Sequence, residues 1–364
     1  MKRKLNCSDS AVWLAIGVSD TSSYTAVMIF QVITYSVVCQ LVDVVGVSTN
    51  IINIICFIKQ GFKDPVNVSL LGLAVADLLC LITLLWTNIC MTPAFQALDL
   101  PFHAVELQHL TTCVMHTTFT RLSGWITALI IVERCLCITA PLKVKSIVTP
   151  KRVAVVVVCL FIILTSSVSP VYMVSRLDHK YFQDINKTLI GIVYTKNRES
   201  VEQVSYFINN VFIPFGSFIV IIICTAILVA KLHEKAKWRK KSAVSAQADN
   251  VSTRNQKVAK MMVMISTLFV ACFFPHSVGF IAMALLPELS VGGKFNDLLL
   301  ILAGICFLLE SINSSANIFF YYRMSSKYRA AFCELLHISS VKHLHTVMHQ
   351  SLRRSIWCDS GTIK

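Results

Sequence analysis

Seven long runs of apolar residues, almost free of charge in their central parts, dominate the chain. They cover about residues 27–58, 66–92, 107–135, 153–175, 204–232, 257–286 and 298–321. A helix needs about 20 apolar residues to cross a bilayer core, whereas a barrel strand is about half as long and alternates. Only helices satisfy the backbone in lipid over runs of this length. The pattern predicts an all-α membrane protein with a seven-helix bundle at residues 26–322.

Composition and charge agree with a membrane protein and indicate its orientation. Of the 364 residues, 55% are hydrophobic and 14% are charged, which disfavours a disordered chain or a soluble enzyme. The net charge is +14, and most of the 33 Lys and Arg residues fall in the segments that face the cytoplasm if the N-terminus is outside. We therefore expect a plasma-membrane protein with an extracellular N-terminus (1–25) and a cytoplasmic tail (338–364). The surplus positive charge then faces lipid, and no nucleic acid is expected. The short apolar segment 11–18 is not taken as a cleaved signal peptide.

The connection between the fourth and fifth runs is long, polar and extracellular in this topology. Two strand-like stretches, Lys180–Phe182 and Leu189–Thr195, lie on either side of the turn residues Asn186-Lys187, so we expect a β-hairpin. Asn186 also begins a glycosylation sequon, as does Asn6 near the N-terminus. Both sequons fall on the expected outer side, so both are predicted glycosylation sites.

Polar residues lie in the middle of several apolar runs, where a charge is costly and functional by default. Asp77 is the charged residue of the second run. The residues expected at a similar depth are Asn50, Ser123, Asn313, Ser314 and Asn317. One carboxylate with hydroxyls and amides offers oxygen ligands to Na⁺ or a proton. Two interpretations stay open: an ion site, or a polar network between helices that holds no ion.

Seven short motifs follow one another in a fixed order along the chain. They are Asn50, Leu73–Asp77 (LAVAD), Glu133-Arg134-Cys135, Pro141-Leu142, Pro214, Phe269–Pro275 (FVACFFP) and Asn317–Tyr321 (NIFFY). Through these motifs the chain resembles the rhodopsin-like (class A) G-protein-coupled receptors over about residues 25–337. The match to invertebrate neuropeptide or chemosensory receptors is narrower, and it implies a neuropeptide or a polar chemosensory cue as the ligand.

The sequence departs from the family pattern at several positions. Phe273 replaces a tryptophan and Ile318 a proline, while His109 stands where the family has the cysteine of its outer disulfide. Cys90 and Cys113 are expected at similar heights. They form either a replacement disulfide or two free thiols.

The resemblance implies a ligand pocket between the outer halves of the helices. Its residues are His116, Phe119, Thr120, Arg121, His276, Glu310 and Ser311. His116 stands where amine receptors hold an aspartate, which disfavours an amine ligand, and Ser311 stands where opsins hold the retinal lysine. Arg121 either pairs with Glu310, is hydrogen-bonded inside the bundle, or holds a ligand carboxylate.

The resemblance also assigns roles at the inner end. Glu133 and Arg134 can pair there. The residues expected to couple to the G protein are Glu133, Arg134, Leu142 and Tyr321, and those expected to permit helix bends or switching are Pro214, Phe269, Phe273 and Pro275. An amphipathic eighth helix is expected at 325–337, with Cys333 as a palmitoylation site. The implied partners are an extracellular peptide or small molecule, a heterotrimeric G protein, arrestin and the lipid bilayer. No cofactor is expected apart from an allosteric sodium ion.

A different class of function remains an alternative. A seven-span ion- or proton-coupled transporter could use Asp43, Asp77, Arg121 and Glu310 as relay groups. Transporters commonly carry internal repeats and broken helices, and the sequence shows neither. No metalloprotease, phosphate-loop or nucleophile-elbow motif occurs, so an enzyme is not expected.

Overall fold

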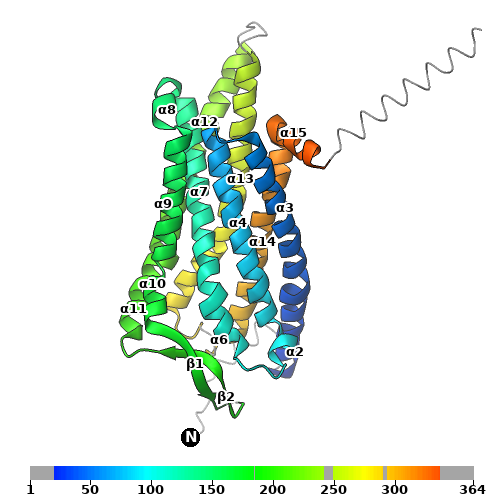
Figure 1. Cartoon of the computed structure of the whole chain (residues 1–364), viewed down its shortest axis with the longest axis vertical. Helices are drawn as coiled ribbons and strands as arrows, with labels where there is room; N and C mark the ends of the chain where they lie inside the picture. The colour runs from blue at the N-terminus through cyan, green and yellow to red at the C-terminus, as the bar shows by residue number, and fades with distance from the viewer. Residues whose placement is uncertain (1–19, 184, 242–248, 290–292, 337–364) are drawn as a thin grey trace, which may run out of the picture.

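Seven long helices run side by side in the computed structural model, which describes residues 20–183, 185–241, 249–289 and 293–336 (Figure 1). Within the described residues, seven helices are long and apolar enough to cross a membrane, as the sequence predicts. They span Thr25–Gln60, Pro65–Met91, Ala104–Thr139, Pro150–Val174, Arg198–Glu234, Lys257–Leu285 and Asn296–Arg323. Each apolar run of the sequence lies largely within one of these helices. The prediction of a seven-helix bundle is confirmed.

Several of these helices are built from more than one element. The first joins α2 (Asp20–Gln31), the π-helical segment η1 (Val32–Cys39) and α3 (Gln40–Gln60); the third joins α6 (Ala104–Gln108), η2 (His109–Cys113) and α7 (Val114–Thr139); the fourth joins α9 (Pro150–Ser166) and α10 (Ser169–Val174); the fifth joins α11 (Arg198–Tyr206), η3 (Phe207–Phe212) and α12 (Ile213–Lys241). The others are α4 (Pro65–Met91), α13 (Asp249–Leu285) and α14 (Asn296–Met324). The short helices α5 (Pro93–Gln96) and α8 (Pro141–Ile147) lie in connections. The hydrophobic pattern does not reveal the π-helical segments, which widen the first, third and fifth helices in their N-terminal halves.

Local sequence signals explain where the helices begin. Asp64 caps α4 by accepting from the amide of Val66, and Pro65 occupies the first helical position. Thr149 caps α9 in the same way through the amide of Arg152. A side-chain oxygen before a proline satisfies a free amide and fixes the start of a helix.

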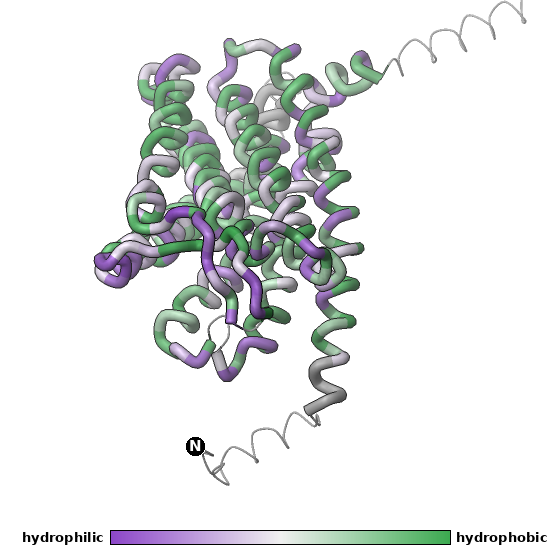
Figure 2. The backbone as a smooth tube through the Cα atoms, turned by 60° about the horizontal axis from the view of Figure 1, so that its bottom comes forward, coloured by the Kyte–Doolittle hydropathy of each residue, from purple (hydrophilic) through white to green (hydrophobic). Residues whose placement is uncertain are grey.

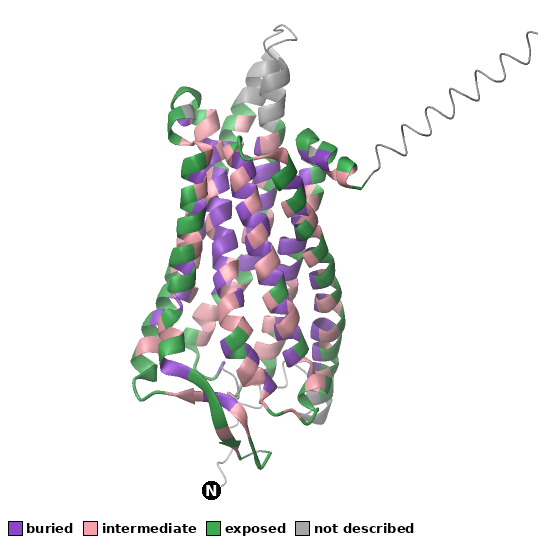
Figure 3. Ribbon diagram, in the orientation of Figure 1, coloured by how far each residue is buried: buried purple, intermediate pink, exposed green. Residues whose placement is uncertain are grey.

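The bundle buries its central helices and exposes apolar side chains on its outside. Side chains of α4 and α7 form the main core together with neighbours from α9, α12 and α13 (Figure 3). Large aliphatic residues such as Val155, Ile163 and Ile219 stay more than half exposed. In a soluble protein such a surface would aggregate, whereas here it fits a lipid environment.

The expected β-hairpin is present at the end of the bundle where the first membrane helix begins, which we call the outer end; the opposite end is called the inner end. Strand β1 (Ser175–Phe182) pairs antiparallel with β2 (Lys187–Tyr194), in a register that runs from Ser175↔Tyr194 to Phe182↔Lys187. Its strands carry hydrophilic stretches, in contrast to the largely hydrophobic helices (Figure 2). Asn186 lies in the turn with a positive φ of 51°, a conformation that asparagine tolerates better than most residues.

A short helix, α15 (Ser326–Leu335), follows the last membrane helix. It packs against α3, and Lys59 forms an ion pair with Glu334 at 3.3 Å. The expected eighth helix is thus present as a helix. Residues 1–19 and 337–364 lie outside the described residues, together with Asn6 and the expected cytoplasmic tail.

Candidate functional site

A small cavity of about 30 Å³ lies between α7, η3, α12 and α13. It reaches the outer half of the bundle, where the sequence predicts a ligand pocket. Three of the predicted residues line it, namely Thr120, Arg121 and His276. Phe269 and Phe273 form its apolar wall, with ring centroids 4.5 Å apart. Phe119 packs against the main core instead.

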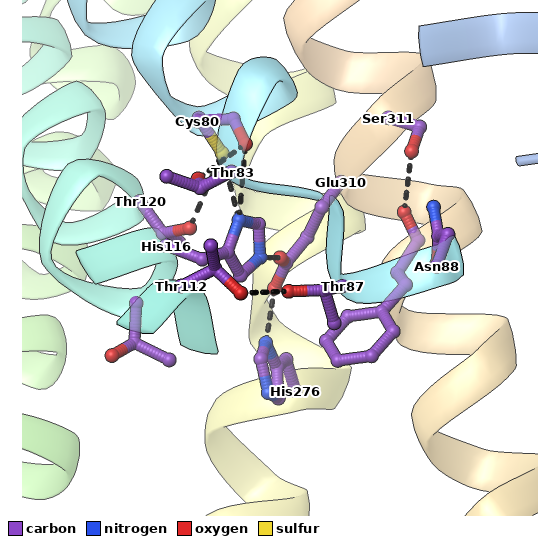
Figure 4. A network of polar contacts seen from close by, with 12 residues as sticks. Cys80, Thr83, Thr87, Asn88, Thr112, His116, Thr120, His276, Glu310 and Ser311 are labelled. Carbon is purple, nitrogen blue, oxygen red and sulfur yellow. Dashed lines mark hydrogen bonds and ion pairs between the residues drawn. The ribbon is translucent and has the colours of Figure 1, made fainter. Parts of the chain in front are cut away.

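Next to this cavity, two histidines share one buried carboxylate (Figure 4). His116 Nε2 lies 2.6 Å from Glu310 Oε2, and His276 Nδ1 contacts the other oxygen of the same carboxylate. Neither His116 nor Glu310 is exposed to solvent. The contact joins α7, α13 and α14, so any change in the protonation or position of one member affects three helices.

The second nitrogen of His116 faces α4. Its Nδ1 lies 3.3 Å from the carbonyl of Cys80 and 3.4 Å from the Cys80 thiol. A carbonyl and a carboxylate both accept hydrogen bonds, so His116 satisfies Cys80 and Glu310 together when both ring nitrogens carry a proton. Cys80 lies three residues after Asp77 on the same helix, and this spacing is the signal that could have identified it.

Further polar residues surround this network on the side of α3 and α4. Asn88 Nδ2 donates to Asp43 Oδ2 at 2.8 Å, and Ser311 Oγ donates to the carbonyl of Phe307 at 2.9 Å. All of these side chains except Phe307 are almost fully buried. The outer half of the bundle therefore contains a second buried polar pair near the histidines, of which sequence reasoning missed Asn88.

Arg121 does not pair with Glu310, so that predicted alternative is wrong. Its Nη1 donates to the carbonyl of Asn209 at 2.9 Å and to Asn210 Oδ1 at 3.2 Å, and its Nη2 donates to Thr118 Oγ1 at 2.9 Å. The two histidines already occupy both oxygens of Glu310. Arg121 is instead hydrogen-bonded to neutral groups inside the bundle, as the second predicted alternative states.

The residues predicted around Asp77 come together in the middle of the bundle. Ser123 Oγ donates to Asp77 Oδ1 at 2.8 Å, and Asn317 Nδ2 donates to Oδ2 at 2.7 Å. Asn50 Nδ2 donates to the carbonyl of Ser314 at 2.8 Å. Asn313 is also buried. Two oxygens of this group, Asn317 Oδ1 and Ser314 Oγ, are buried without a hydrogen-bond partner among the described residues.

At the inner end, Glu133 and Arg134 do not form the ion pair that their adjacency suggests. Glu133 Oε1 accepts from Ser69 Oγ at 2.9 Å, and Arg134 Nε is buried without a partner in the described part of the chain. Successive residues of a helix point about 100° apart, so neighbours do not face each other. Arg134 is therefore held at this end of the bundle without a carboxylate of the described residues bound to it.

Two more of the predicted inner residues have distinct environments. Tyr321 is buried against Phe57 and Tyr328, with ring centroids 5.2 and 5.6 Å away, and its hydroxyl has no partner in the described residues. Leu142 is the second residue of α8 and is 92% exposed. An exposed leucine at this end of the bundle is available to a protein partner.

The two predicted prolines sit where helix geometry changes. Pro214 follows the π-helical segment η3, and Pro275 lies inside α13. A proline removes one backbone donor from the helix and weakens it locally. Pro275 adjoins Phe273 and His276, so this weak point lies at the cavity wall.

Comparison with known proteins identifies the family. The sequence profile described as "7 transmembrane receptor (rhodopsin family)" matches residues 48–321. The chain belongs to this family.

Individual relatives are distant. The chain is 26% identical over 239 residues to the growth hormone secretagogue receptor type 1 of Sus scrofa, a match that covers 63% of this chain and 62% of that receptor. It is 26% identical over 324 residues to the type-1 angiotensin II receptor of Gallus gallus, covering 88% of this chain and 83% of that receptor. It is 22% identical over 311 residues to the allatostatin-A receptor of Bombyx mori, covering 81% and 77%. The match to the pig receptor spans less than two thirds of that protein.

This rhodopsin-family chain holds its outer hairpin without a disulfide. Cys90 and Cys113 are both free thiols, so the replacement disulfide is absent and the alternative of free thiols holds. In its place, Glu106 accepts from the amide of Ile192 at 2.6 Å and from Lys180 Nζ at 2.7 Å. A lone glutamate at a helix start gives no sequence signal for this role.

The backbone adds to the attachment of the hairpin. The amide of His103 donates to the carbonyl of Ile190 at 2.9 Å, and the amide of Ile190 donates to the carbonyl of Pro101 at 3.0 Å. A Cβ at Gly191 would lie 2.6 Å from Glu106 Oε2, so a glycine is needed for the carboxylate to approach. We call Glu106, Lys180, Gly191 and Ile192 the hairpin clasp.

A second, larger cavity of about 450 Å³ lies outside the bundle, between the loop that follows α4 and the hairpin. Lys187 pairs with Asp99 at 2.7 Å across its rim, and this hydrogen bond lowers the pKa of Asp99. His103 lines it, stacked on Phe182. Burial lowers the pKa of His103 and has the largest effect. The charge of Glu106 raises this pKa, and the charge of Lys180 lowers it further.

The two predicted modification sites in the described residues differ in access. Asn186 is exposed at the hairpin tip, beside the hydroxyl of Tyr181. Cys333 is half-buried on α15. Both remain predictions.

Proposed function

We propose that this chain is a plasma-membrane receptor that binds an extracellular peptide and passes the signal to a heterotrimeric G protein. Its relatives are named for angiotensin II, allatostatin-A and a growth hormone secretagogue, and we infer a ligand of similar kind. The signal is relayed by helix rearrangement, without bonds made or broken. A polar chemosensory cue is the competing ligand class, and the experiment below distinguishes the two.

The observation that carries the proposal is the His116–Glu310–His276 contact at the edge of the outer cavity. His276 lines the cavity and also binds Glu310. A ligand that enters there competes with Glu310 for His276, and it thereby changes how α13 packs on α14. A ligand that prefers one packing shifts the population toward it, and a G protein that prefers the same packing gains affinity by linkage.

The inner end supplies the surface for the partner. We propose that the N-terminus lies outside and α15 inside, and the distribution of Lys and Arg supports this orientation. Arg134, free of Glu133, and the exposed Leu142 then face the G protein, and we expect arrestin to use the same surface. The exposed aliphatic belt contacts lipid, and a palmitoyl group on Cys333 would anchor α15 to the membrane.

We also propose that the Asp77 network binds Na⁺. Asp77, Ser123 and Asn317 supply oxygen atoms, which are the ligands that hard cations prefer. The unpartnered Oδ1 of Asn317 supports this assignment. The ion would neutralise a carboxylate that is otherwise bonded only to neutral groups, and it would stabilise the packing in which these residues converge.

The transporter alternative has less support. Its proposed relay groups have separate partners: Asp43 is bonded to Asn88, Asp77 to Ser123 and Asn317, and Glu310 to two histidines. The family to which the chain belongs is one of receptors. Flux in proteoliposomes that depends on an ion gradient would favour transport over signalling.

A reporter screen tests the proposal. Cells that express the full chain with a promiscuous G protein are exposed to a library of short peptides and, separately, to small polar metabolites. We expect a saturable response to a peptide, which Arg134→Ala abolishes at equal surface expression because the inner contact is lost. A response only to small metabolites would contradict the peptide assignment. A response that survives Arg134→Ala would remove Arg134 from the mechanism.

A further inference from the structure

Arg121 is a buried cation without a buried anion beside it. It is 6% exposed, and no carboxylate of the described residues lies within 4 Å of its guanidinium. Its three partners, described above, are a carbonyl, an amide oxygen and a hydroxyl, which are all neutral. An arginine stays protonated in proteins. A charge buried this deeply is usually paired, so the missing counter-charge needs an explanation.

The backbone acceptor for Arg121 arises from the sequence of the fifth helix. In η3 the amide of Ile213 bonds to the carbonyl of Ile208, five residues earlier. In that register, the next amide would belong to residue 214 and would bond to the carbonyl of Asn209. Pro214 has no amide hydrogen. The carbonyl of Asn209 is thus left free, and Arg121 donates to it.

The guanidinium keeps donors in reserve. It carries five N–H groups, and its three hydrogen bonds leave two of them unused. One of these is at Nε, which is buried and has no partner in the described part of the chain. The neutral contacts therefore orient Arg121 without saturating it.

The cavity beside Arg121 offers no counter-charge of its own. The other residues that line it are Thr117, Thr120, Gly124, Asn209, Asn210, Pro214, Ser217, Phe218, Phe269, Phe273, His276, Ser277 and Phe280. They include no acid. His276, the other ionisable residue of the wall, already holds Glu310. A space of about 30 Å³ holds a group of a few atoms, such as the head of a carboxylate.

We propose that Arg121 binds a carboxylate of the extracellular ligand. This inference rests on the proposed function and adds the chemical class of the group that enters deepest. A planar carboxylate matches the two free donors of a guanidinium and supplies the missing charge. The rest of the ligand extends outward from the cavity, past His276 and Phe280.

Acetate serves as the probe, because the natural ligand is not needed to test the subsite. The full chain is purified in lipid nanodiscs, and its melting temperature is followed while acetate is added, with the uncharged isostere acetamide in parallel. We expect acetate to raise the melting temperature by about 3 °C at ten times its dissociation constant, and acetamide to leave it unchanged. Arg121→Gln removes the acetate effect, whereas Arg176→Gln, at an exposed arginine of β1, keeps it.

Two outcomes would overturn the proposal: an acetate effect of equal size in Arg121→Gln, or an acetamide effect equal to that of acetate. If Arg121→Gln does not fold, infrared spectra of ¹³C-acetate with the unaltered chain decide the question. A shifted carboxylate band that Arg121→Lys weakens supports the fork, and the absence of a shifted band refutes it.

The acetate measurement uses no G protein, so its outcome is independent of the outcome of the reporter screen. A peptide response without an acetate effect would refute the carboxylate subsite and leave the receptor assignment. An acetate effect in a chain that answers no peptide would leave the subsite and refute the peptide assignment. When an active peptide is found, its free-acid and amidated forms are compared, and the subsite predicts loss of potency in the form that lacks the carboxylate.

Discussion

The hairpin clasp is the structural feature whose removal has the most direct consequence. Glu106 hydrogen-bonds to both strands, through Lys180 on β1 and the amide of Ile192 on β2. Glu106→Ala deletes both contacts. We expect the hairpin to open more often while the seven helices stay intact, because the helices do not depend on it for packing.

The magnitude follows from the two bonds that are lost. A buried hydrogen bond to a charged group contributes about 2 kcal/mol. The Lys180–Glu106 pair has side chains that are 38% and 24% exposed, so it adds less than about 1 kcal/mol. We therefore expect the free energy of local opening to fall by about 2 kcal/mol, which is about a 30-fold increase in the exchange rate of the β2 amides.

Hydrogen–deuterium exchange on the full chain in nanodiscs measures this directly at β2. Glu106→Gln keeps one acceptor for the amide of Ile192, so its β2 exchange rate is expected to lie between those of Glu106→Ala and the unaltered chain. Glu199→Gln, at an exposed glutamate of α11, is the matched control and should change nothing at β2. Equal protection of β2 in Glu106→Ala and in the unaltered chain would refute the clasp.

Three further predictions concern the inner end, the ion site and the outer loop. Leu142→Ala should lower the apparent affinity for the G protein about tenfold, because a buried leucine contributes about 1.5–3 kcal/mol; Lys143→Ala is the adjacent control, and equal effects of both would remove Leu142 from the interface. Asp77→Asn should abolish any dependence of peptide affinity on sodium concentration, measured by competition binding, and a surviving dependence would point to another ion site. The pKa of His103 is lowered from its ordinary value of 6.5 in the folded chain. Below that pH the unfolded loop therefore binds more protons than the folded loop, so the stability of the loop should fall as the pH drops below about 6.5. Exchange at pH 5 and 7.5 measures this, and His103→Asn, which can still cap α6, should remove the pH dependence.

The fold could be predicted from the sequence because lipid leaves the backbone few choices. Long apolar runs must be helical there, so the seven helices and their order follow from hydropathy. The hairpin followed from the turn residues Asn186-Lys187 and the strands beside them. The π-helical segments could not be predicted, since they depend on which carbonyls find partners across the bundle, as Asn209 does with Arg121.

The polar contacts likewise divide into those that could be predicted from the sequence and those that could not. Asp77, Ser123 and Asn317 could be grouped because equal depth in the bilayer and helical spacing place them together. The partner of Arg121 could not be predicted, because opposite charge favours Glu310 while two histidines on separate helices already bind that carboxylate. Depth is readable from one sequence, whereas the rotation of one helix against another is not.

The last membrane helix connects the polar layers of the bundle. Glu310, Ser314, Asn317 and Tyr321 follow one another on α14 at intervals of four, three and four residues, so they share one face. This face meets the histidines at the outer end, Asp77 in the middle and the aromatic contacts of Tyr321 at the inner end. A rigid helix that rotates or shifts at Glu310 must also move Asn317 and Tyr321. We therefore expect a ligand that releases His276 from Glu310 to change both the sodium affinity at Asp77 and the packing of Tyr321, and a ligand effect on one without the other would contradict this coupling.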